Sequence, residues 1–269
     1  MFFDTHTHVN SEEFSAKGGS ASGGKDDADA VIQRALDNST WMVNVGTSAS
    51  TSKQAVEIAN KYSQGVFASV GLHPSDIGTE SFDETKYEKL LTDKVVAVGE
   101  CGLDYFRLPN NQDIEKIKQA QKQEFIKQLV FATKHDLAVI IHCRAAYTNL
   151  LEIMDAECQS NRVIIHSFTD TWDTAKKFLD RGYYIALNGI LTFDKTGKLA
   201  EVAEKTPLEK LLTETDAPYL APPPFRGKRN EPLYVQYVVQ KIAGIKKLPV
   251  EAVGQQTFEN ARRLFKIKM

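Results

Sequence analysis

Eight short apolar runs alternate with amphipathic helical patterns along the 269 residues of the chain. Runs that are apolar on both faces are typical of parallel strands buried between helices. We expect such strands at residues 2–8, 41–46, 66–71, 95–100, 137–142, 162–166, 183–189 and 211–216. The intervening helices are expected from residue 27 and over 50–62, 83–91, 112–135, 145–157, 171–181 and 199–204, with two more at 231–243 and 249–265.

This alternation predicts an α/β protein, a single-domain (β/α)8 TIM barrel over residues 1–269. The competing fold, a doubly wound open sheet, binds its ligand at a glycine-rich first turn. No G-x-G-x-x-G sequence follows the first expected strand, so we favour the barrel. Residues 15–24 are rich in glycine and serine, and we expect them to form a mobile loop or a lid.

Composition limits the kinds of molecule that the protein can bind and the cell compartment in which it can reside. A formal net charge of −2 excludes a surface that is basic throughout, so any contact with phosphate groups must be local. Three cysteines are too few for a disulfide framework and suit a reducing compartment. The sequence shows no signal peptide, and no apolar run approaches the ~20 residues that a membrane span needs. We therefore expect a cytoplasmic protein that makes no membrane contact.

Candidate metal ligands stand at the carboxyl ends of five of the expected strands. In a barrel these ends meet at one mouth, where the active sites of this fold lie. The ligands exceed what one tetrahedral ion needs, so we expect two divalent ions with a bridging carboxylate between them. Imidazole together with carboxylate favours Zn²⁺, with Mn²⁺ or Mg²⁺ as alternatives. The expected ligands are His6, His8, Glu100, His142, His166 and Asp216, with Glu100 as the bridge.

The first strand supplies two of these ligands from one face. Side chains at positions i and i+2 of a strand point the same way, about 6.6–6.8 Å apart, so His6 and His8 can close on one ion. Asp4 has the same parity and is expected to orient one of these imidazoles, as oxygen atoms near metal-bound histidines commonly do. We expect one ion to be bound by His6, His8 and Asp216, and the other by His142 and His166.

Arginines near the same mouth are candidates for binding phosphate. Arg144 lies two residues beyond His142 on the same strand face, so its guanidinium can reach a phosphate above the metals. The alternative for Arg144 is a structural pairing with a helix carboxylate. A basic turn that could also contact substrate follows the eighth strand, with a solvated loop as the alternative. It contains Arg226, Lys228 and Arg229.

Three further residues end or follow strands at the predicted mouth. His73 could position substrate or cap its strand, while Asp104 and Tyr105 could line the mouth or pack the loop that follows the fourth strand. Cys101 and Cys143 alternate out of phase with the ligands beside them, so we expect them to face the helices as small hydrophobic residues.

Seven segments spread over nearly the whole chain carry a family resemblance. They are DTHTH at 4–8, GLHP at 71–74, GECGLDY at 99–105, IHCR at 141–144, HSF at 166–168, ETDAPYL at 214–220 and RGKRNEP at 226–232. In these segments the chain resembles the TatD family of metal-dependent deoxyribonucleases, within the amidohydrolase superfamily. The resemblance implies a barrel, divalent metals on the six ligands named above, and hydrolysis of DNA phosphodiester bonds, often from the 3′ end.

We therefore expect a divalent-metal-dependent deoxyribonuclease, a monomer that acts as a 3′–5′ exonuclease on DNA ends or single-stranded DNA. A water activated by the metals would attack phosphorus, and Asp216 would accept its proton. One alternative is an ester or amide hydrolase of the same superfamily, such as a D-aminoacyl-tRNA deacylase. Another is a metal-dependent binder of nucleic acid without catalysis, which the complete ligand set and the candidate base argue against.

Overall fold

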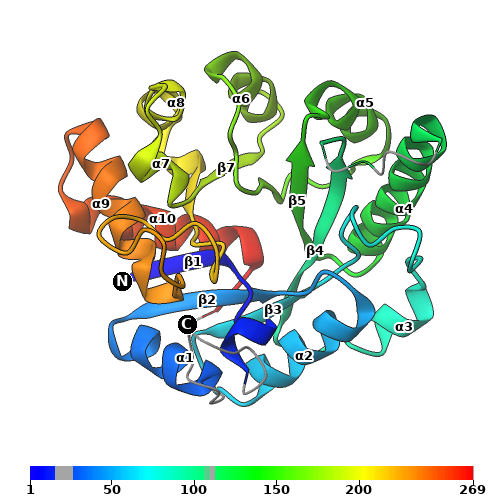
Figure 1. Cartoon of the computed structure of the whole chain (residues 1–269), viewed down its shortest axis with the longest axis horizontal. Coiled ribbons are helices and arrows are strands. Elements are labelled where there is room, and N and C mark those ends of the chain that lie inside the picture. Colours follow the sequence, from blue (N-terminus) through cyan, green and yellow to red (C-terminus); the bar gives the residue numbers. More distant parts are fainter. Residues whose placement is uncertain (16–26, 107, 109–112, 269) are drawn as a thin grey trace.

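The computed structural model describes residues 1–15, 27–106, 108 and 113–268. Eight parallel strands pair in chain order from β1 to β8, with helices between them, and form a nearly closed barrel. This confirms the predicted fold, and Figure 1 shows the helices arranged around the strands in chain order. Residues 16–24 of the glycine- and serine-rich segment lie outside the described residues. None of the helices in the described ranges is long and apolar enough to cross a membrane.

All eight expected strands are present. They are β1 (Phe2–Thr7), β2 (Thr40–Val45), β3 (Val66–Val70), β4 (Val95–Asp104), β5 (Ala138–Arg144), β6 (Val163–Ile165), β7 (Tyr184–Leu187) and β8 (Leu211–Thr213). β6 and β8 are shorter than expected because the backbone turns at the mouth: Ser167 and Asp216 have φ angles of +46° and +57°. β4 continues to Asp104, four residues beyond its expected end at Glu100.

The helices follow the predicted alternation with one addition. They are α1 (Ala28–Asp37), α2 (Ala49–Asn60), α3 (Glu84–Glu88), α4 (Ile114–Lys134), α5 (Tyr147–Glu157), α6 (Trp172–Leu179), α7 (Ile190–Phe193), α8 (Lys198–Lys205), α9 (Val235–Lys246) and α10 (Val250–Phe265). The short helix α7, directly after β7, was not predicted, because four residues are too few to show a helical period.

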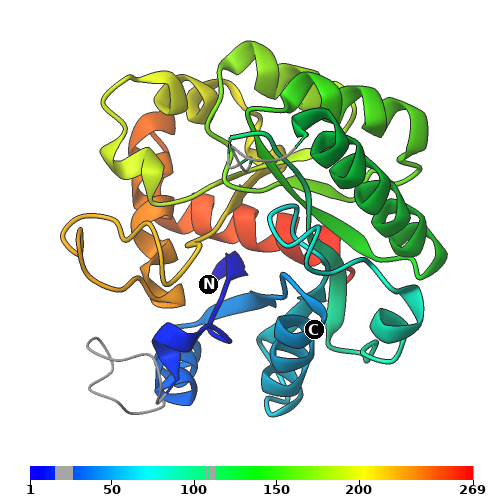
Figure 2. The same cartoon turned by 45° about the vertical axis from the view of Figure 1, so that its right-hand side comes forward.

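Aliphatic and aromatic side chains fill the barrel interior, and α10 closes its amino-terminal end. The interior cluster includes Ile140, Ile164 and Leu212 from three strands. At the start of β1 the ring of Phe3 lies 5.9 Å from the rings of both Phe258 and Phe265 of α10. Figures 1 and 2 show α10, in red, beside β1 rather than in the outer ring of helices. The opposite, carboxyl-terminal end is left for the mouth.

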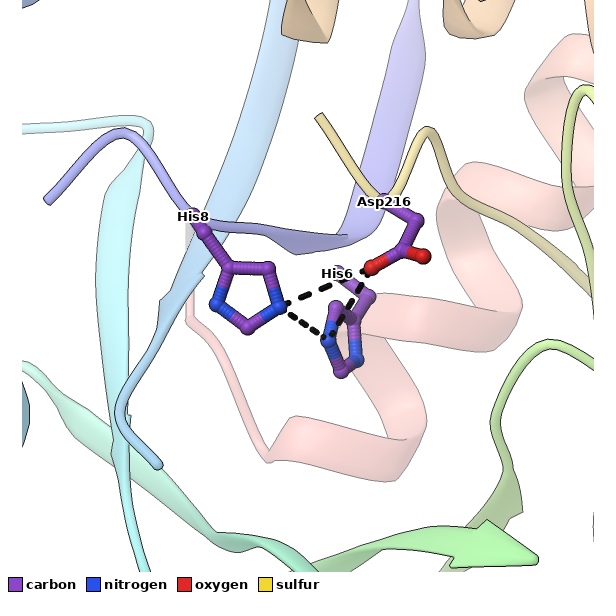
Figure 3. A group of neighbouring side chains, drawn as sticks. All are labelled: His6, His8 and Asp216. Carbon is purple, nitrogen blue, oxygen red and sulfur yellow. Dashed lines mark hydrogen bonds and ion pairs between the residues drawn. The ribbon is translucent and has the colours of Figure 1, made fainter. Parts of the chain in front are cut away.

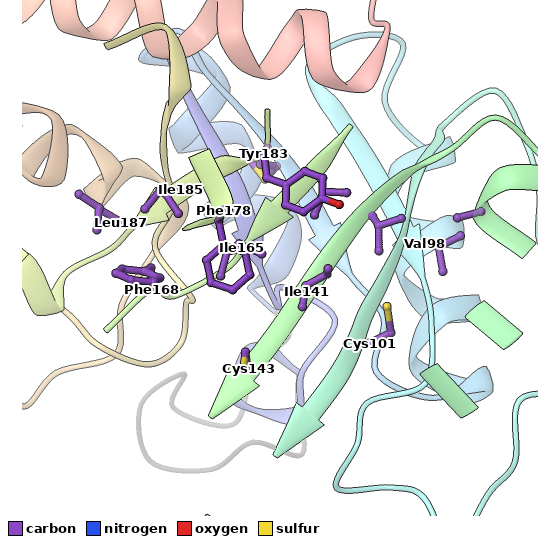
Figure 4. Packing of buried hydrophobic residues seen from close by; sticks show 14 of the residues in the cluster. Val98, Cys101, Ile141, Cys143, Ile165, Phe168, Phe178, Tyr183, Ile185 and Leu187 are labelled. Atoms are coloured by element: carbon purple, nitrogen blue, oxygen red, sulfur yellow. The ribbon is translucent and has the colours of Figure 1, made fainter. Parts of the chain in front are cut away.

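A second hydrophobic layer lies between the strands and the outer helices (Figure 4). Cys101 and Cys143 belong to it, together with residues such as Ile141 and Phe178. Both cysteines are buried, and burial raises the pKa of each thiol. They are therefore neutral, as expected of residues that face the helices rather than a metal.

Side chains join β1 to β8 where the barrel closes. The Thr5 hydroxyl donates to the Thr213 carbonyl oxygen at 3.2 Å, and the Thr213 hydroxyl donates to the Phe3 carbonyl oxygen at 3.1 Å. The Asp4 carboxylate accepts hydrogen bonds from the Thr215 backbone N–H at 2.8 Å and from its hydroxyl at 2.5 Å. This set of contacts, which we call the β1–β8 seam, is fully buried.

β4 is irregular where it presents Glu100. Its pairing with β5 shifts register between Val98 and Cys101. Gly102 follows with a φ angle of +138°, and a Cβ built there would lie 2.1 Å from the carbonyl oxygen of His142. Glycine therefore allows the two strands to approach closely at the level of Glu100 and His142.

We expect the Gly102→Ala substitution to lower the free energy of unfolding by about 2–5 kcal/mol, because it adds both a backbone clash and an unfavourable φ angle. Urea denaturation in the presence of a chelator measures this without a contribution from metal binding. Gly244 is the matched control, since it is exposed in α9 and its Cβ would meet nothing within 4 Å. Gly244→Ala should raise stability by roughly 0.5–1 kcal/mol. Similar effects of the two substitutions would contradict this reading of β4.

Candidate metal centre

A cavity of about 910 Å³ opens at the carboxyl ends of the strands. Its volume lies within the range of roughly 300–1,000 Å³ that is typical of small-molecule sites. The histidines and carboxylates that line it are His8, His73, Asp76, Glu100, His142, His166 and Asp216. His6 is fully buried beside them. The structure thus brings all six predicted ligands to one place, together with His73.

Glu100 stands at the centre of the cluster. Its Oε2 lies 3.4 Å from His6 Nε2 and 3.8 Å from His8 Nε2. Ring nitrogens of three more histidines surround its Oε1: His142 Nδ1 at 2.9 Å, His73 Nε2 at 3.5 Å and His166 Nε2 at 3.7 Å. The two carboxylate oxygens therefore face different groups of imidazoles, which is the arrangement needed of a bridge between two ions.

His6, His8 and Asp216 converge on one side of Glu100. The Nε2 atoms of the two histidines are 3.0 Å apart. Asp216 Oδ1 lies 3.5 Å from His8 Nε2 and 3.8 Å from His6 Nε2, and Figure 3 shows the three side chains pointing toward one another. The Asp216 backbone N–H also donates to the His6 carbonyl oxygen at 2.9 Å, which ties the end of β8 to β1.

The expectation that Asp4 orients an imidazole is wrong. Its Oδ1 accepts hydrogen bonds from the backbone N–H groups of His6 at 3.2 Å and of Thr215 at 2.8 Å. The pairing of β1 with β2 shifts register between Asp4 and Thr7, so the simple alternation on which the expectation depended is interrupted. His6 Nδ1 is buried and has no hydrogen-bond partner within the described residues.

On the other side of the cluster, His142 lies between the carboxylates of Glu100 and Asp104. Its Nδ1 is 2.9 Å from Glu100 Oε1, and its Nε2 is 3.2 Å from Asp104 Oδ2. The His73 ring lies edge-on to the His142 ring, with 4.4 Å between their centroids. One ligand atom each from His73, Glu100 and His142 fall within 4.8 Å of one another, so His73 is placed as a ligand candidate as well as a substrate contact.

His166 lies between the two groups: its Nε2 faces the same Glu100 oxygen as His142, at 3.7 Å, while its ring lies against His6, so the ligands do not divide as simply as expected. The His6 and His166 rings stack with centroids 3.5 Å apart, and their ligand atoms and one from Glu100 lie within 4.8 Å of one another. His166 Nδ1 lies 3.0 Å from Glu214 Oε1. Burial lowers the pKa of His166, but Glu214 and Glu100 outweigh it and raise that pKa to about 10. Glu214 was not predicted, although its alternation with Asp216 was a signal that could have found it.

The two carboxylates among the predicted ligands remain ionised despite their burial. Burial raises the pKa of Glu100, but His73 and the other imidazoles lower it well below its ordinary value. Burial also raises the pKa of Asp216, and hydrogen bonding with His8 and the nearby imidazoles reverses this, so that its pKa is lowered. Buried carboxylate charge needs a cation beside it. Imidazole nitrogens with ionised carboxylates form the donor set of zinc and manganese sites, so these residues fit divalent metal ions.

Two arginines stack on phenylalanines near the mouth. Arg144 lines the cavity, and its guanidinium carbon lies 3.9 Å from the centroid of the Phe106 ring. Arg226 lies in the same way over Phe193, at 3.8 Å, and donates to the Ala221 carbonyl oxygen at 3.0 Å. Stacking holds a planar guanidinium in place while its N–H groups stay directed outward in the plane.

Other expected substrate contacts have structural partners. Arg229 donates to both Asp27 oxygens, at 3.0 and 2.5 Å, and its side chain is only 12% exposed, so it fastens the loop after β8 to the start of α1. Asp104 is 1% exposed and lies against His142 rather than in the open cavity. Tyr105 packs against the hydrophobic layer between the strands and the helices, and Lys118 Nζ lies 5.3 Å from the centroid of its ring.

Buried glutamines of α4 hold two segments of the mouth, which the sequence did not reveal. Gln121 accepts a hydrogen bond from the Asp104 backbone N–H at 3.0 Å and donates to its carbonyl oxygen at 3.1 Å. Gln128 makes the same pair of contacts with Leu72, at 2.8 and 3.0 Å, next to His73. Two glutamines seven residues apart, on the apolar face of a predicted helix, were the available signal.

Known proteins resemble this chain over nearly its whole length. A family model described as "TatD related DNase" matches residues 3–266. The uncharacterized metal-dependent hydrolase YabD of Bacillus subtilis (strain 168) is 36% identical over 271 residues, which cover 99% of this chain and 100% of that protein. A protein of Erwinia billingiae (strain Eb661) named 3′-5′ ssDNA/RNA exonuclease TatD is 33% identical over 250 residues, covering 90% of this chain and 94% of that one.

A solved structure agrees with the sequence comparison. The crystal structure of YJJV, a TatD homologue from Escherichia coli K12, matches with a TM-score of 0.85 at 29% identity. The match covers 99% of this chain and 98% of the other.

Proposed function

The chain belongs to the TatD-related DNase family of metal-dependent hydrolases, and from this we propose that it hydrolyses DNA phosphodiester bonds, as a 3′–5′ exonuclease acting on strand ends. The observation that carries the proposal is the combination of Glu100, whose two oxygens face separate imidazole groups, with Arg144 in the same cavity. Metal ligands beside a fixed guanidinium suit a phosphate group. The exonuclease name of the relative from Erwinia billingiae supports the same activity.

We propose two divalent ions, with zinc favoured and manganese or magnesium as alternatives. Glu100 would lie between them, His6, His8 and Asp216 on one side, and His142 on the other, with His166 facing Glu100 from beside His6. When bound, the ions would make water more acidic and withdraw negative charge from a phosphoryl group.

We propose that Asp216 accepts the proton of the attacking water. Its carboxylate lines the cavity, and the surrounding imidazoles lower its pKa, so it is ionised and able to take up a proton. Its backbone is fixed by hydrogen bonds at both ends, from its own N–H to the His6 carbonyl and from the Tyr219 N–H to its carbonyl, each 2.9 Å long. A base held in this way loses little freedom in the transition state.

We propose that Arg144, which lines the cavity, binds a phosphate oxygen of the substrate, whereas Arg229 is engaged with Asp27. The mouth of a barrel admits a strand end more readily than the middle of a stiff duplex. Binding should therefore depend only weakly on salt, with a log–log slope of roughly −2 to −3, which corresponds to about three or four phosphate contacts to single-stranded DNA.

We expect Arg144→Ala to reduce kcat/KM by about 1.5–3 kcal/mol, the range for a charge-assisted hydrogen bond, and to flatten the salt slope by about 0.7. Digestion of 3′-end-labelled single-stranded DNA over a salt series measures both quantities. Arg181→Ala is the matched control, because Arg181 pairs with Asp155 on the outer surface and should leave both unchanged. A slope as steep as that of a protein that coats duplex DNA would contradict this mode of binding.

Digestion of end-labelled linear DNA beside covalently closed circles of the same sequence tests the proposed function. Linear DNA should be shortened from its 3′ end while the circles persist. Equal loss of the circles would show that the enzyme is an endonuclease and not an exonuclease. Turnover of carboxylic esters, amides or D-aminoacyl-tRNA, with none of DNA under any of the three metals, would overturn the phosphodiesterase proposal.

A further inference from the structure

Two exposed aromatic side chains flank the mouth. Phe106 follows β4 and is 66% exposed, and Tyr219 follows β8 and is 53% exposed. Because the eight strands pair in chain order around the barrel, β4 and β8 lie across it from each other. The two rings therefore stand on opposite sides of the ligand cluster. A single exposed aromatic residue is common, but exposed apolar surface at the polar rim of a cavity is typical of a ligand-binding site.

Phe106 is fixed beside a phosphate-binding group. Its backbone N–H donates to Asp104 Oδ1 at 2.9 Å, and the other oxygen of that carboxylate lies 3.2 Å from His142 Nε2. The guanidinium of Arg144, which lines the cavity, stacks over the Phe106 ring at 3.9 Å. The guanidinium covers one face of the ring, and the exposed remainder of Phe106 is left to contact a nucleobase next to the bound phosphate.

Tyr219 is fixed to the opposite side of the metal centre. It lines the cavity, and its backbone N–H donates to the Asp216 carbonyl oxygen at 2.9 Å. Its own carbonyl oxygen accepts from Asn230 Nδ2 at 2.6 Å, and the fully buried Asn230 also donates to the Thr215 carbonyl oxygen at 2.9 Å. Movement of the Tyr219 backbone is therefore coupled to the position of Asp216, the proposed proton acceptor.

We propose that Phe106 and Tyr219 each stack on a nucleobase of a single-stranded end, one on either side of the bond that is cleaved. The inference rests on the proposed function and adds to it the recognition of bases. Every base has a π face, so stacking on these rings tolerates any sequence. In a duplex these faces are covered by neighbouring base pairs. Unpaired ends of DNA or RNA are therefore preferred over paired ends and over phosphodiesters that carry no base.

The test compares two oligonucleotides with the same backbone, one with normal bases and one with abasic residues at its three 3′-terminal positions. Dissociation constants are measured by fluorescence anisotropy, and kcat/KM by release of the end label. The wild type should favour the base-containing strand by roughly 5- to 100-fold for each stacked base. Phe106→Ala and Tyr219→Ala should each remove one such factor, whereas Phe106→Trp and Tyr219→Phe should keep it.

The ratio of the two strands separates stacking from phosphate binding. Phe106→Ala also frees Arg144, but phosphate contacts are common to both strands, so that effect weakens both equally and leaves the ratio unchanged. Val130→Ala is the control, because Val130 is 57% exposed on α4 and does not line the cavity. Equal binding of the two strands by the wild type, or an unchanged ratio in both alanine variants, would overturn the inference. If neither strand is hydrolysed, the proposed function fails, and the binding ratio still decides this inference.

Discussion

Replacing Glu100 with glutamine is expected to lower kcat/KM about 10³-fold or more and to reduce the number of bound metal ions per chain. Among the carboxylates that the structure describes, Glu100 alone has two oxygens that face different imidazole groups, and an amide offers a single neutral oxygen. Loss of one group that stabilises transition-state charge commonly costs ~10²–10³ in rate, and here the loss extends to the ions themselves.

Elemental analysis after metal loading and dialysis measures the stoichiometry, beside assays of the same preparations. The wild type should hold two ions and the variant fewer. Glu124→Gln is the matched control: Glu124 is a buried glutamate on α4 that accepts from the Phe82 backbone N–H at 2.7 Å and from Lys127 at 2.6 Å, away from the cavity. The Glu124→Gln variant should hold two ions, as the wild type does. A wild type with fewer than about one and a half ions, and an unchanged Glu100→Gln variant, would rule out a bridged pair.

Replacing Asp216 with asparagine should lower kcat by about 10²–10⁴ with a much smaller change in KM, because a proton acceptor acts in the transition state and contributes little to substrate binding. Asparagine is the right replacement for a structural reason. The φ angle of Asp216 is +57°, a conformation that asparagine adopts far more readily than alanine. Asp216→Ala would therefore combine lost chemistry with backbone strain, whereas Asp216→Asn keeps the backbone.

Metal content must be measured on the same Asp216→Asn samples, because Asp216 also faces His6 and His8. A low kcat with two ions retained supports a base, and loss of an ion assigns the effect to metal binding. Asp76→Asn is the control: Asp76 lines the cavity and belongs to none of the ligand groups among the described residues. It should keep most of the activity. A near-normal kcat for Asp216→Asn would move the proton acceptor elsewhere, with His73 the next candidate.

The positions of the candidate ligands were predictable because the period of a strand is regular. Ala138 and Ile140 of β5 point into the barrel, and His142 continues the same series at the mouth. His166 follows Ile164 of β6 in the same way. Alternation and the common end of parallel strands therefore suffice to place several ligands without any three-dimensional information.

The contacts around these ligands could not be predicted in the same way. Register shifts between Asp4 and Thr7 and between Val98 and Cys101 depend on neighbouring strands, and one such shift redirects every later side chain. The partners of His142 and His166 depend on ring orientations that the sequence does not encode locally. The contacts of Gln128 with Leu72 join segments 56 residues apart, which no local pattern reveals.

The β1–β8 seam determines at what stage of synthesis and folding the candidate metal centre can form. The hydrogen bond from Thr213 to Phe3 spans 210 residues, and closing so long a loop is slow and entropically costly. During synthesis His6 and His8 are made before Asp216, so they have no contact with it until the chain has been extended through β8. Nascent chains and broken fragments therefore lack part of the candidate ligand set. The proposed hydrolase activity should appear only once the last strand has joined the barrel.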